Sequence, residues 1–155
     1  MKILNLGCGH KRITPGAGEE IVNHDRTRHH RWINAVWDLN VRPWPWEDKS
    51  FDTVLALSVF EHLEIDLVQA LDECWRILKP GGTLNAKVPH WQHDNAYADP
   101  THRWRYSLRS FDVVIPGTRL GKMLGFYTAR KWEIVNRPEL NDAKSSVHIT
   151  MRVCK

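Results

Sequence analysis

Apolar residues recur along the chain in short runs, separated by polar segments that contain glycine or proline. Residues 2–6 and 51–57 are mostly apolar, as is typical of parallel strands covered on both faces. Shorter runs at 21–23, 32–36 and 83–88 predict three further strands. Each run is shorter than an average helix, so the pattern favours strands throughout.

One segment has the spacing of a helix. Leu67, Leu71 and Leu78 fall on one helical face, and Lys79-Pro80-Gly81-Gly82 follows directly. A basic last turn followed by proline and glycine is typical of a helix C-terminus. The order of strand, helix and strand over residues 51–88 therefore predicts a right-handed parallel unit.

The crossover after the first strand has a different character. Residues 11–20 contain Pro15, Gly16 and Gly18, too many helix breakers for a helix of three turns. We therefore expect this crossover to be abbreviated.

The C-terminal part predicts two strands and a covering segment. Residues 132–136 have extended character, and apolar and polar residues alternate over 147–153, as in an antiparallel strand with one buried face. Residues 89–131 are irregular, apart from a short helix over 108–115 that Ser107 is expected to cap. This insert is predicted to cover the functional site.

Together these patterns predict the fold class α/β. We expect one domain over residues 1–155, because this length supports a single core. Its centre would be a Rossmann-like, mostly parallel sheet with an antiparallel C-terminal strand. Helices on both faces would make it a three-layer sandwich.

Composition excludes several classes of protein. The hydrophobic fraction of 42% and the charged fraction of 26% are those of a globular domain, and no apolar run approaches the ~20 residues of a membrane span. The three cysteines are odd in number and widely spaced, which favours reduced thiols. Met1-Lys2 leads straight into the apolar Ile3 to Leu6 without the pattern of a signal peptide, so a cytoplasmic location is expected. The net charge of +4 permits an anionic partner without requiring one.

Candidate chemistry lies at the ends of three predicted strands. The turn Gly7-Cys8-Gly9 follows the first strand, Asp25 the second and Asp38 the third. In open α/β sheets the ligand lies beyond the carboxyl ends of the strands, so these residues should converge. Asp25 suits the hydroxyl groups of a ribose, and Asp38 with the backbone of Leu39 suits an adenine.

Two adenosine-containing cofactors are compatible with such a slot. A nicotinamide dinucleotide needs a glycine turn that opens a helix, whose N-terminus holds the pyrophosphate. Here the helix is not predicted, and the third glycine of that motif is lacking. S-adenosylmethionine has no pyrophosphate and is therefore favoured.

Four segments stand out in their order and spacing: Leu4 to Gly9, Asp38 to Asp52 with Pro43-Trp44-Pro45-Trp46, Phe60-Glu61-His62-Leu63, and Arg76 to Gly82. Together they resemble the class I S-adenosylmethionine-dependent methyltransferases, in the small branch with a shortened first crossover. The resemblance covers roughly residues 1–115. It implies that the methionine moiety lies against Gly7, Cys8 and Gly9, the ribose against Asp25, the adenine against Asp38 and Leu39, and the sulfonium beside Ser58.

Two further segments resemble that branch and are expected over the active site, namely Val88-Pro89-His90 and Asp99 to Arg103. His90 and His102 are the candidate bases, needed only if the acceptor must lose a proton. Both could equally serve to hold the covering segment by hydrogen bonds. Candidate substrate-binding residues are Glu61, His93, Arg103, Trp104 and Tyr106, and no metal site is expected.

These observations favour methyl transfer to an oxygen or nitrogen atom of a small molecule. DNA methylation is disfavoured, because Ser58-Val59-Phe60-Glu61 stands where base methyltransferases have an Asn/Asp-Pro-Pro-aromatic motif, and because 155 residues leave little room for base recognition. A non-catalytic S-adenosylmethionine-binding module is the main alternative. A nicotinamide-dependent oxidoreductase is a weaker one, and the oligomeric state is not predicted.

Overall fold

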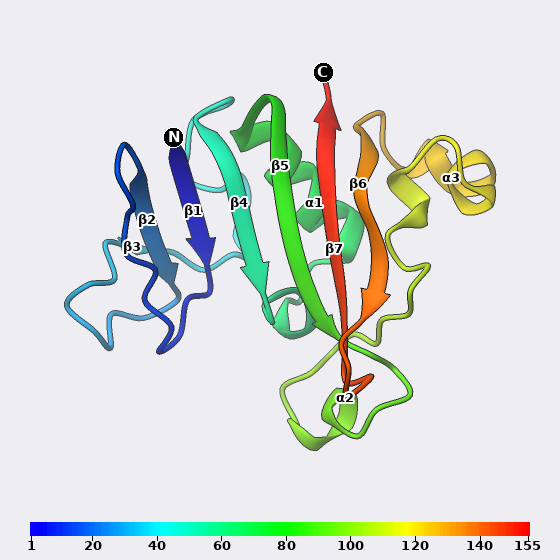
Figure 1. The fold of residues 1–155 in the computed structure, drawn as a ribbon, viewed down its shortest axis with the longest axis horizontal. Helices are drawn as coiled ribbons and strands as arrows, with labels where there is room; N and C mark the ends of the chain where they lie inside the picture. The colour runs from blue at the N-terminus through cyan, green and yellow to red at the C-terminus, as the bar shows by residue number, and fades with distance from the viewer.

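A computed structural model describes all residues 1–155 and contains one seven-stranded sheet with the strand order β3-β2-β1-β4-β5-β7-β6 (Figure 1). The strands are β1 (Lys2–Leu6), β2 (Glu20–Asp25), β3 (Ala35–Val36), β4 (Phe51–Leu57), β5 (Leu78–Pro89), β6 (Lys131–Leu140) and β7 (Ser146–Cys154). Strand β7 is antiparallel to both of its neighbours, and the strands from β3 to β5 pair in parallel. The predicted α/β class, with a mostly parallel sheet and an antiparallel C-terminal strand, is confirmed.

Helices are few and short. The α-helices are α1 (Leu67–Ile77), α2 (Asn95–Ala98) and α3 (Arg119–Leu124), and 3-10 turns are formed by Phe60–His62, Asp112–Val114 and Gly125–Tyr127. Helix α1 begins with a capping box in which the Asp66 carboxylate accepts from the Gln69 amide at 2.8 Å and the Gln69 side chain accepts from the Asp66 amide at 3.1 Å. The local sequence thus determines where this helix begins.

The hydrophobic core lies between the sheet and α1. Leu4, Val54 and Leu84 project from three neighbouring strands and are fully buried, and Leu71 and Ile77 of α1 lie in the same cluster. Burial of each such side chain stabilises the fold by about 1.5–3 kcal/mol. In Figure 1, α1 lies behind β5 and β7.

The opposite face of the sheet carries no helix, and many of its side chains are polar. Its side chains are hydrogen-bonded across strands: Asn5 to Asn23 at 2.9 Å, and Thr150 to Asn85 at 2.8 Å. The structure therefore differs from the expected three-layer sandwich. The physical reason is that the crossovers from β1 to β2 and from β2 to β3 contain no helix that would cover this face.

The third strand is shorter than predicted. Residues 32–34 were expected in the strand, but the side chain of Asn34 accepts from the backbone amide of Asn23 at 2.7 Å, where a parallel strand would supply a carbonyl. Pairing with β2 therefore starts at Ala35.

The end of the predicted helix and the start of β5 also differ from expectation. The helix ends at Ile77, and Leu78 already pairs with Phe51 of β4 before an irregularity in the ladder. Strand β5 therefore begins five residues before the predicted position at Thr83.

No α-helix forms over residues 108–115. The hydroxyl of Ser107 accepts from the amide of Arg109 at 3.2 Å, which makes a local turn, and a single 3-10 turn follows. The unpredicted helix α3 comes after Pro116, where Thr118 caps it through a hydrogen bond from the Gly121 amide at 2.9 Å.

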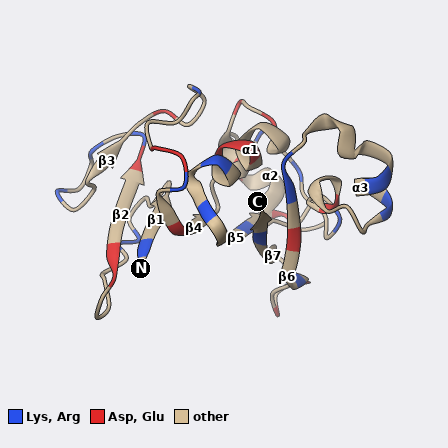
Figure 2. Ribbon diagram, turned by 90° about the horizontal axis from the view of Figure 1, so that it is seen from above, with Lys and Arg blue, Asp and Glu red and all other residues tan.

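Charged residues are distributed over most of the elements. Figure 2 shows basic residues on α3 and β6 as well as near β3, with acidic residues among them. None of the helices has the length and apolar character that crossing a membrane requires.

Candidate functional site

The turn after β1 places two glycines, which have no side chains, at the edge of the sheet. Gly7 and Gly9 have φ angles of +53° and +52°, a region that favours glycine. A Cβ atom on Gly7 would lie 2.8 Å from Cγ2 of Val59, whereas one on Gly9 would have no neighbour within 4 Å. Gly7 is thus required by packing, and Gly9 keeps an open side.

Asp25, at the end of β2, binds this turn to the sheet. Its Oδ2 accepts from the Gly9 amide at 2.7 Å, and its Oδ1 accepts from the Arg26 amide at 2.7 Å. A carboxylate offers about four acceptor positions, so lone pairs remain for ligand hydroxyl groups.

His24 supports the same turn from β2. Its Nδ1 accepts from the Gly7 amide at 3.3 Å, and its Nε2 donates to the Trp37 carbonyl at 3.0 Å, an assignment that requires the neutral ring. Burial lowers the pKa of His24 below its ordinary value, in agreement with a neutral ring. His24 was not among the predicted site residues, although it directly precedes Asp25.

Asp38 and Leu39 follow β3. The Asp38 carboxylate accepts from the Asn40 amide at 3.0 Å and lies 3.3 Å from Nη2 of Arg26. The backbone amide of Leu39 makes no hydrogen bond within the chain, so it remains available to a ligand.

A cavity of about 350 Å³ lies between these groups. It is lined by predicted cofactor residues and by several that were not predicted: Gly7, Gly9, His24, Asp25, Arg26, Trp37, Asp38, Leu39, Asn40, Ser58, Val59, His62 and Leu63. The structure therefore brings together all predicted cofactor residues except Cys8. The Cys8 thiol is buried, which raises its pKa to about 11, so it is an inert thiol beside the turn.

A second cavity, of about 400 Å³, adjoins the first. It is polar and is lined by Ser58, Glu61, His62, Lys87, Pro89, Asn95, Ala98, Asp99, His102, Ser145 and Ser146. Ser58 and His62 line both cavities, so they form a common wall. Ser58 directly follows β4 and has a φ of +64°, a strained conformation of the kind found at functional sites.

Buried polar groups gather in this second cavity. Glu61 is 1% exposed and its Oε2 has no hydrogen-bond partner, and burial raises the pKa of its carboxyl to about 7. The Nδ1 of His102 is also buried without a partner. The rings of His62 and His102 meet edge to face with centroids 4.7 Å apart.

Residues 4–86, more than half of the chain, match a protein family described as a methyltransferase domain. The chain belongs to this methyltransferase domain family. The resemblance to class I S-adenosylmethionine-dependent methyltransferases is thereby confirmed.

Two curated relatives of this methyltransferase domain match over shorter stretches. The mitochondrial ubiquinone biosynthesis O-methyltransferase of Bos taurus is 31% identical over 102 residues, which cover 54% of this chain and 27% of the relative. A probable S-adenosylmethionine-dependent methyltransferase of Mycolicibacterium smegmatis is 38% identical over 72 residues, covering 46% of this chain and 27% of the relative. The chain thus spans about a quarter of the length of these relatives.

A solved structure shows the same fold at low sequence identity. The crystal structure of the [4+2]-cyclase SpnF superposes with a TM-score of 0.65 at 14% identity, covering 97% of this chain and 73% of that one. The likeness in fold extends over nearly the whole chain, beyond residues 4–86 that match the family. Because that protein is a cyclase, the fold alone does not establish the reaction.

The predicted catalytic histidines, which follow the matched residues 4–86, lie in different environments. His102 lines the second cavity, and its side chain is 10% exposed. His90 is 6% exposed, pairs with Tyr106 in a short bridge and lines neither cavity. Of the two, only His102 therefore lines the cavity that Ser58 also lines.

The predicted substrate-binding residues are also divided. Glu61 lines the second cavity, but His93 accepts from the Asn95 amide at 3.1 Å at the start of α2, and Arg103 pairs with Glu64 at 2.9 Å. Neither His93 nor Arg103 lines the second cavity.

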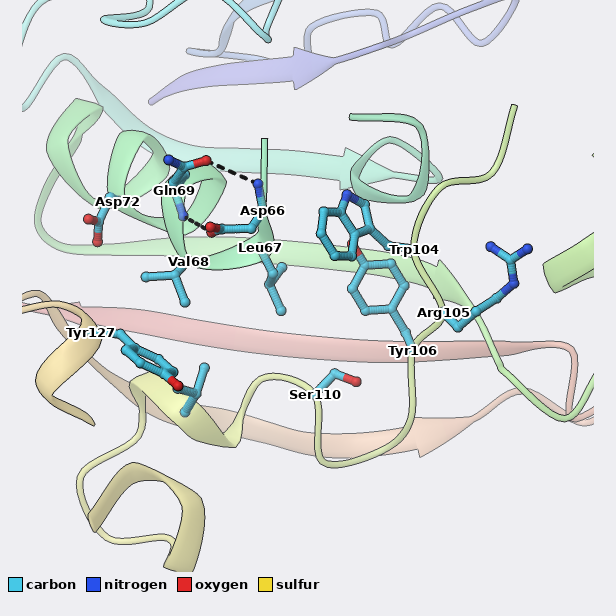
Figure 3. A pocket seen from close by; sticks show the side chains of 11 residues that line it. Asp66, Leu67, Val68, Gln69, Asp72, Trp104, Arg105, Tyr106, Ser110 and Tyr127 are labelled. Atoms are coloured by element: carbon cyan, nitrogen blue, oxygen red, sulfur yellow. Dashed lines mark hydrogen bonds between the residues drawn. The ribbon is translucent and has the colours of Figure 1, made fainter. Parts of the chain in front are cut away.

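Trp104 and Tyr106 line a third cavity of about 630 Å³, beside the N-terminus of α1 (Figure 3). The indole nitrogen of Trp104 donates to the Leu63 carbonyl at 2.8 Å. Figure 3 shows both rings between α1 and the segment that carries Ser110, with Tyr127 at the far end. These aromatic residues therefore line a cavity separate from the one that contains Glu61 and His102.

Proposed function

We propose that this chain is an S-adenosylmethionine-dependent methyltransferase that acts on an oxygen or nitrogen atom of a small molecule. The observation that carries the proposal is the common wall of Ser58 and His62 between two cavities. One cavity has the donors and acceptors that adenosine requires, and the other is polar and buried enough to hold a small acceptor. Methyl transfer needs this adjacency, because alignment of the two reactants contributes most of the catalysis.

The residues of the first cavity fit the cofactor. Asp25 retains acceptor positions for ribose hydroxyl groups, and the Leu39 amide with the Asp38 carboxylate can recognise an adenine edge. The open side of Gly9 leaves room for the methionine moiety. When bound, S-adenosylmethionine supplies an electrophilic methyl group on a sulfonium.

The second cavity is proposed to bind the methyl acceptor. An acceptor hydroxyl or amine loses a proton as its bond to the methyl carbon forms, and His102 is the predicted catalytic residue positioned to receive it. Glu61 lies in the same cavity and is proposed to contact the acceptor. His90, His93, Arg103, Trp104 and Tyr106 are proposed to act through the covering segment, because none of them lines this cavity.

The acceptor is proposed to be small. A cavity of about 400 Å³ is within the range of small-molecule sites. The Bos taurus relative is named as an O-methyltransferase, which favours oxygen over nitrogen. Nucleic acid remains disfavoured, since the basic residues on α3, on β6 and near β3 are interspersed with acidic ones (Figure 2). The free cysteines support the proposed cytoplasmic location.

Calorimetric titration with S-adenosylmethionine and S-adenosylhomocysteine, with a reduced nicotinamide dinucleotide as the control, tests the cofactor assignment. We expect saturable one-site binding of the first two compounds alone. Dinucleotide binding would instead support the oxidoreductase. Release of S-adenosylhomocysteine during an acceptor screen then tests turnover, and binding without turnover on any acceptor would support the non-catalytic module.

A further inference from the structure

Three potential metal ligands meet in the second cavity. Glu61, His62 and His102 each offer one ligand atom, and these atoms lie within 4.8 Å of one another. Two atoms bound to one ion at about 2.0–2.2 Å lie at most roughly 4 Å apart, so small side-chain rotations would close the set. The three residues come from the turn after β4 and from the covering segment, which are 40 residues apart in the sequence.

Each of the three residues has a ligand atom that no protein group uses. Oε2 of Glu61 and Nδ1 of His102 are buried and have no hydrogen-bond partner. His62 uses its Nδ1 for a hydrogen bond of 2.9 Å with the Thr101 hydroxyl, so its Nε2 is left over. Buried polar atoms without partners destabilise a fold, and an ion bound here would satisfy Oε2 of Glu61 and Nδ1 of His102.

The surrounding hydrogen bonds orient the imidazole of His62 as histidine ligands are oriented in metal sites. The Thr101 hydroxyl donates to Oδ1 of Asp99 at 2.7 Å, so it accepts from Nδ1 of His62 and fixes that proton. Histidine ligands usually donate their second ring N–H to a carboxylate or to a hydrogen-bonded intermediary. Nε2 of His102 lies 3.9 Å from Oδ2 of the same Asp99, which is too far for a hydrogen bond but close enough for a favourable charge interaction.

We propose that Glu61, His62 and His102 form a binding site for a divalent transition-metal ion. Two imidazoles and one carboxylate suit ions such as Zn²⁺, Co²⁺ or Mn²⁺, and they leave coordination positions open toward the cavity. The site itself does not depend on the proposed methyltransferase activity. Its consequence for catalysis does depend on that proposed activity. A hydroxyl acceptor bound to the ion would have a lowered pKa and would release its proton to solvent, and His102 would then hold the ion rather than take that proton.

Titration of the untagged protein with Co²⁺ alone tests the site, because imidazole-bound Co²⁺ absorbs visible light. We expect one Co²⁺ per chain, displaced by Zn²⁺. Glu61→Gln, His62→Gln and His102→Gln should each lower the affinity by more than about 100-fold, and Thr101→Val, which leaves the ligands intact, by roughly 10-fold. Thermal unfolding of each variant without metal shows whether it folds. Absence of saturable Co²⁺ uptake by the folded protein would overturn the proposal.

An exposed cluster of His10, His29 and His30 provides the matched control, since it could also take up metal. Its nitrogens are partly engaged, for example Nδ1 of His10 with Nε2 of His30 at 2.8 Å. The double variant His29→Gln/His30→Gln should leave Co²⁺ uptake unchanged, and loss of uptake there would move the site to that cluster.

X-ray absorption of the Zn²⁺-loaded wild-type protein makes the test independent of variant folding. Two imidazoles and a carboxylate would support the proposal, and three imidazoles would overturn it. Because no step of these experiments uses S-adenosylmethionine or an acceptor, failure of the metal site and failure of the proposed function are separately visible.

Discussion

Cγ2 of Val59 lies 2.8 Å from the position that a Cβ atom on Gly7 would occupy. Gly7 also has a φ of +53°. Gly7→Ala therefore combines backbone strain with overpacking, and we expect it to lower the free energy of unfolding by about 2–4 kcal/mol. Urea unfolding measures this change.

Gly9→Ala is the matched control for that variant. Its φ of +52° is almost the same, but no atom lies within 4 Å of the added Cβ, so a loss of about 1–2 kcal/mol from strain alone is expected. The double variant Gly7→Ala/Val59→Ala should recover part of the first loss. Equal losses at both glycines would contradict the packing argument.

Asp25 is expected to bind the ribose of the cofactor. Asp25→Ala should weaken S-adenosylmethionine binding by about 1–3 kcal/mol, because ligand hydroxyl groups and the amides of Gly9 and Arg26 all lose an acceptor. Calorimetry gives the difference. Asp25→Asn keeps one acceptor oxygen and should lose less cofactor affinity. Unchanged affinity in Asp25→Ala would contradict the assignment of Asp25 to the ribose.

Arg76 joins α1 to the chain before β4. It donates to the carbonyls of Trp44 and Trp46 and to the carboxylate of Glu73, whose side chain is only 8% exposed. Arg76→Ala would leave the Glu73 carboxylate buried with a reduced set of donors, and we expect a loss of about 3 kcal/mol in denaturant unfolding.

Replacement of both members of this pair is the informative comparison. Arg76→Met/Glu73→Gln removes the uncompensated charge and should unfold later than Arg76→Ala. A loss below about 1 kcal/mol for Arg76→Ala would show that the pair behaves as an exposed ion pair.

The lowered pKa of His24 predicts that the free energy of unfolding depends on pH. Burial lowers its pKa in the folded state, so below the ordinary value of 6.5 the unfolded chain binds more protons than the folded chain. The free energy of unfolding should therefore be greatest above that pH and decrease as the pH falls through the interval down to the folded-state pKa. Cofactor affinity should hold through this interval and decrease only as the pH falls below the folded-state pKa, where the protonated ring can no longer accept from the Gly7 amide.

Unfolding curves measured at a series of pH values, for the wild type and for His24→Gln, test this. The variant should be less stable near neutrality but should change less with pH in that interval. An equal slope in both proteins would assign the pH dependence to other groups.

His102 and His90 were equivalent candidates in the sequence, and the structure separates them. His102→Ala should retain cofactor binding and lower turnover by roughly 100-fold or more, since the residue lines the second cavity. His90→Gln, at a buried position outside both cavities, should reduce stability while the folded fraction keeps its turnover. Loss of cofactor binding in His102→Ala would instead show that the residue contributes to the first cavity or is needed for folding.

The convergence of Gly7, Asp25 and Asp38 could be predicted from sequence, because parallel strands deliver their carboxyl ends to one edge of a sheet whatever the loops do. The position of α1 could be predicted for a similar reason, since its capping box and apolar spacing are local. Such features depend on short-range rules.

The features that could not be predicted from sequence depend on contacts between segments that lie far apart in the chain. The Asn34 side chain shortens β3 by accepting from Asn23, and no strand pattern shows this. The grouping of His102 with Glu61 rests on the path of the covering segment, including the hydrogen bond from the Arg103 amide to the Glu61 carbonyl at 2.7 Å. Irregular segments have no periodicity from which such a path could be read.

The polar face of the sheet makes this chain a scaffold that can be enlarged without opening its core. The loop over residues 10–19 crosses on that side, where the Asn5 side chain donates to the Lys11 carbonyl and the Asn23 side chain donates to the Ile13 carbonyl. A helix grafted into this loop would lie on side chains that already bond to one another, while the glycine turn and Asp25 stay at the strand ends. The cofactor pocket thus forms without the layer of helices that larger α/β proteins place on this face. The pocket and such a layer can therefore be engineered one after the other.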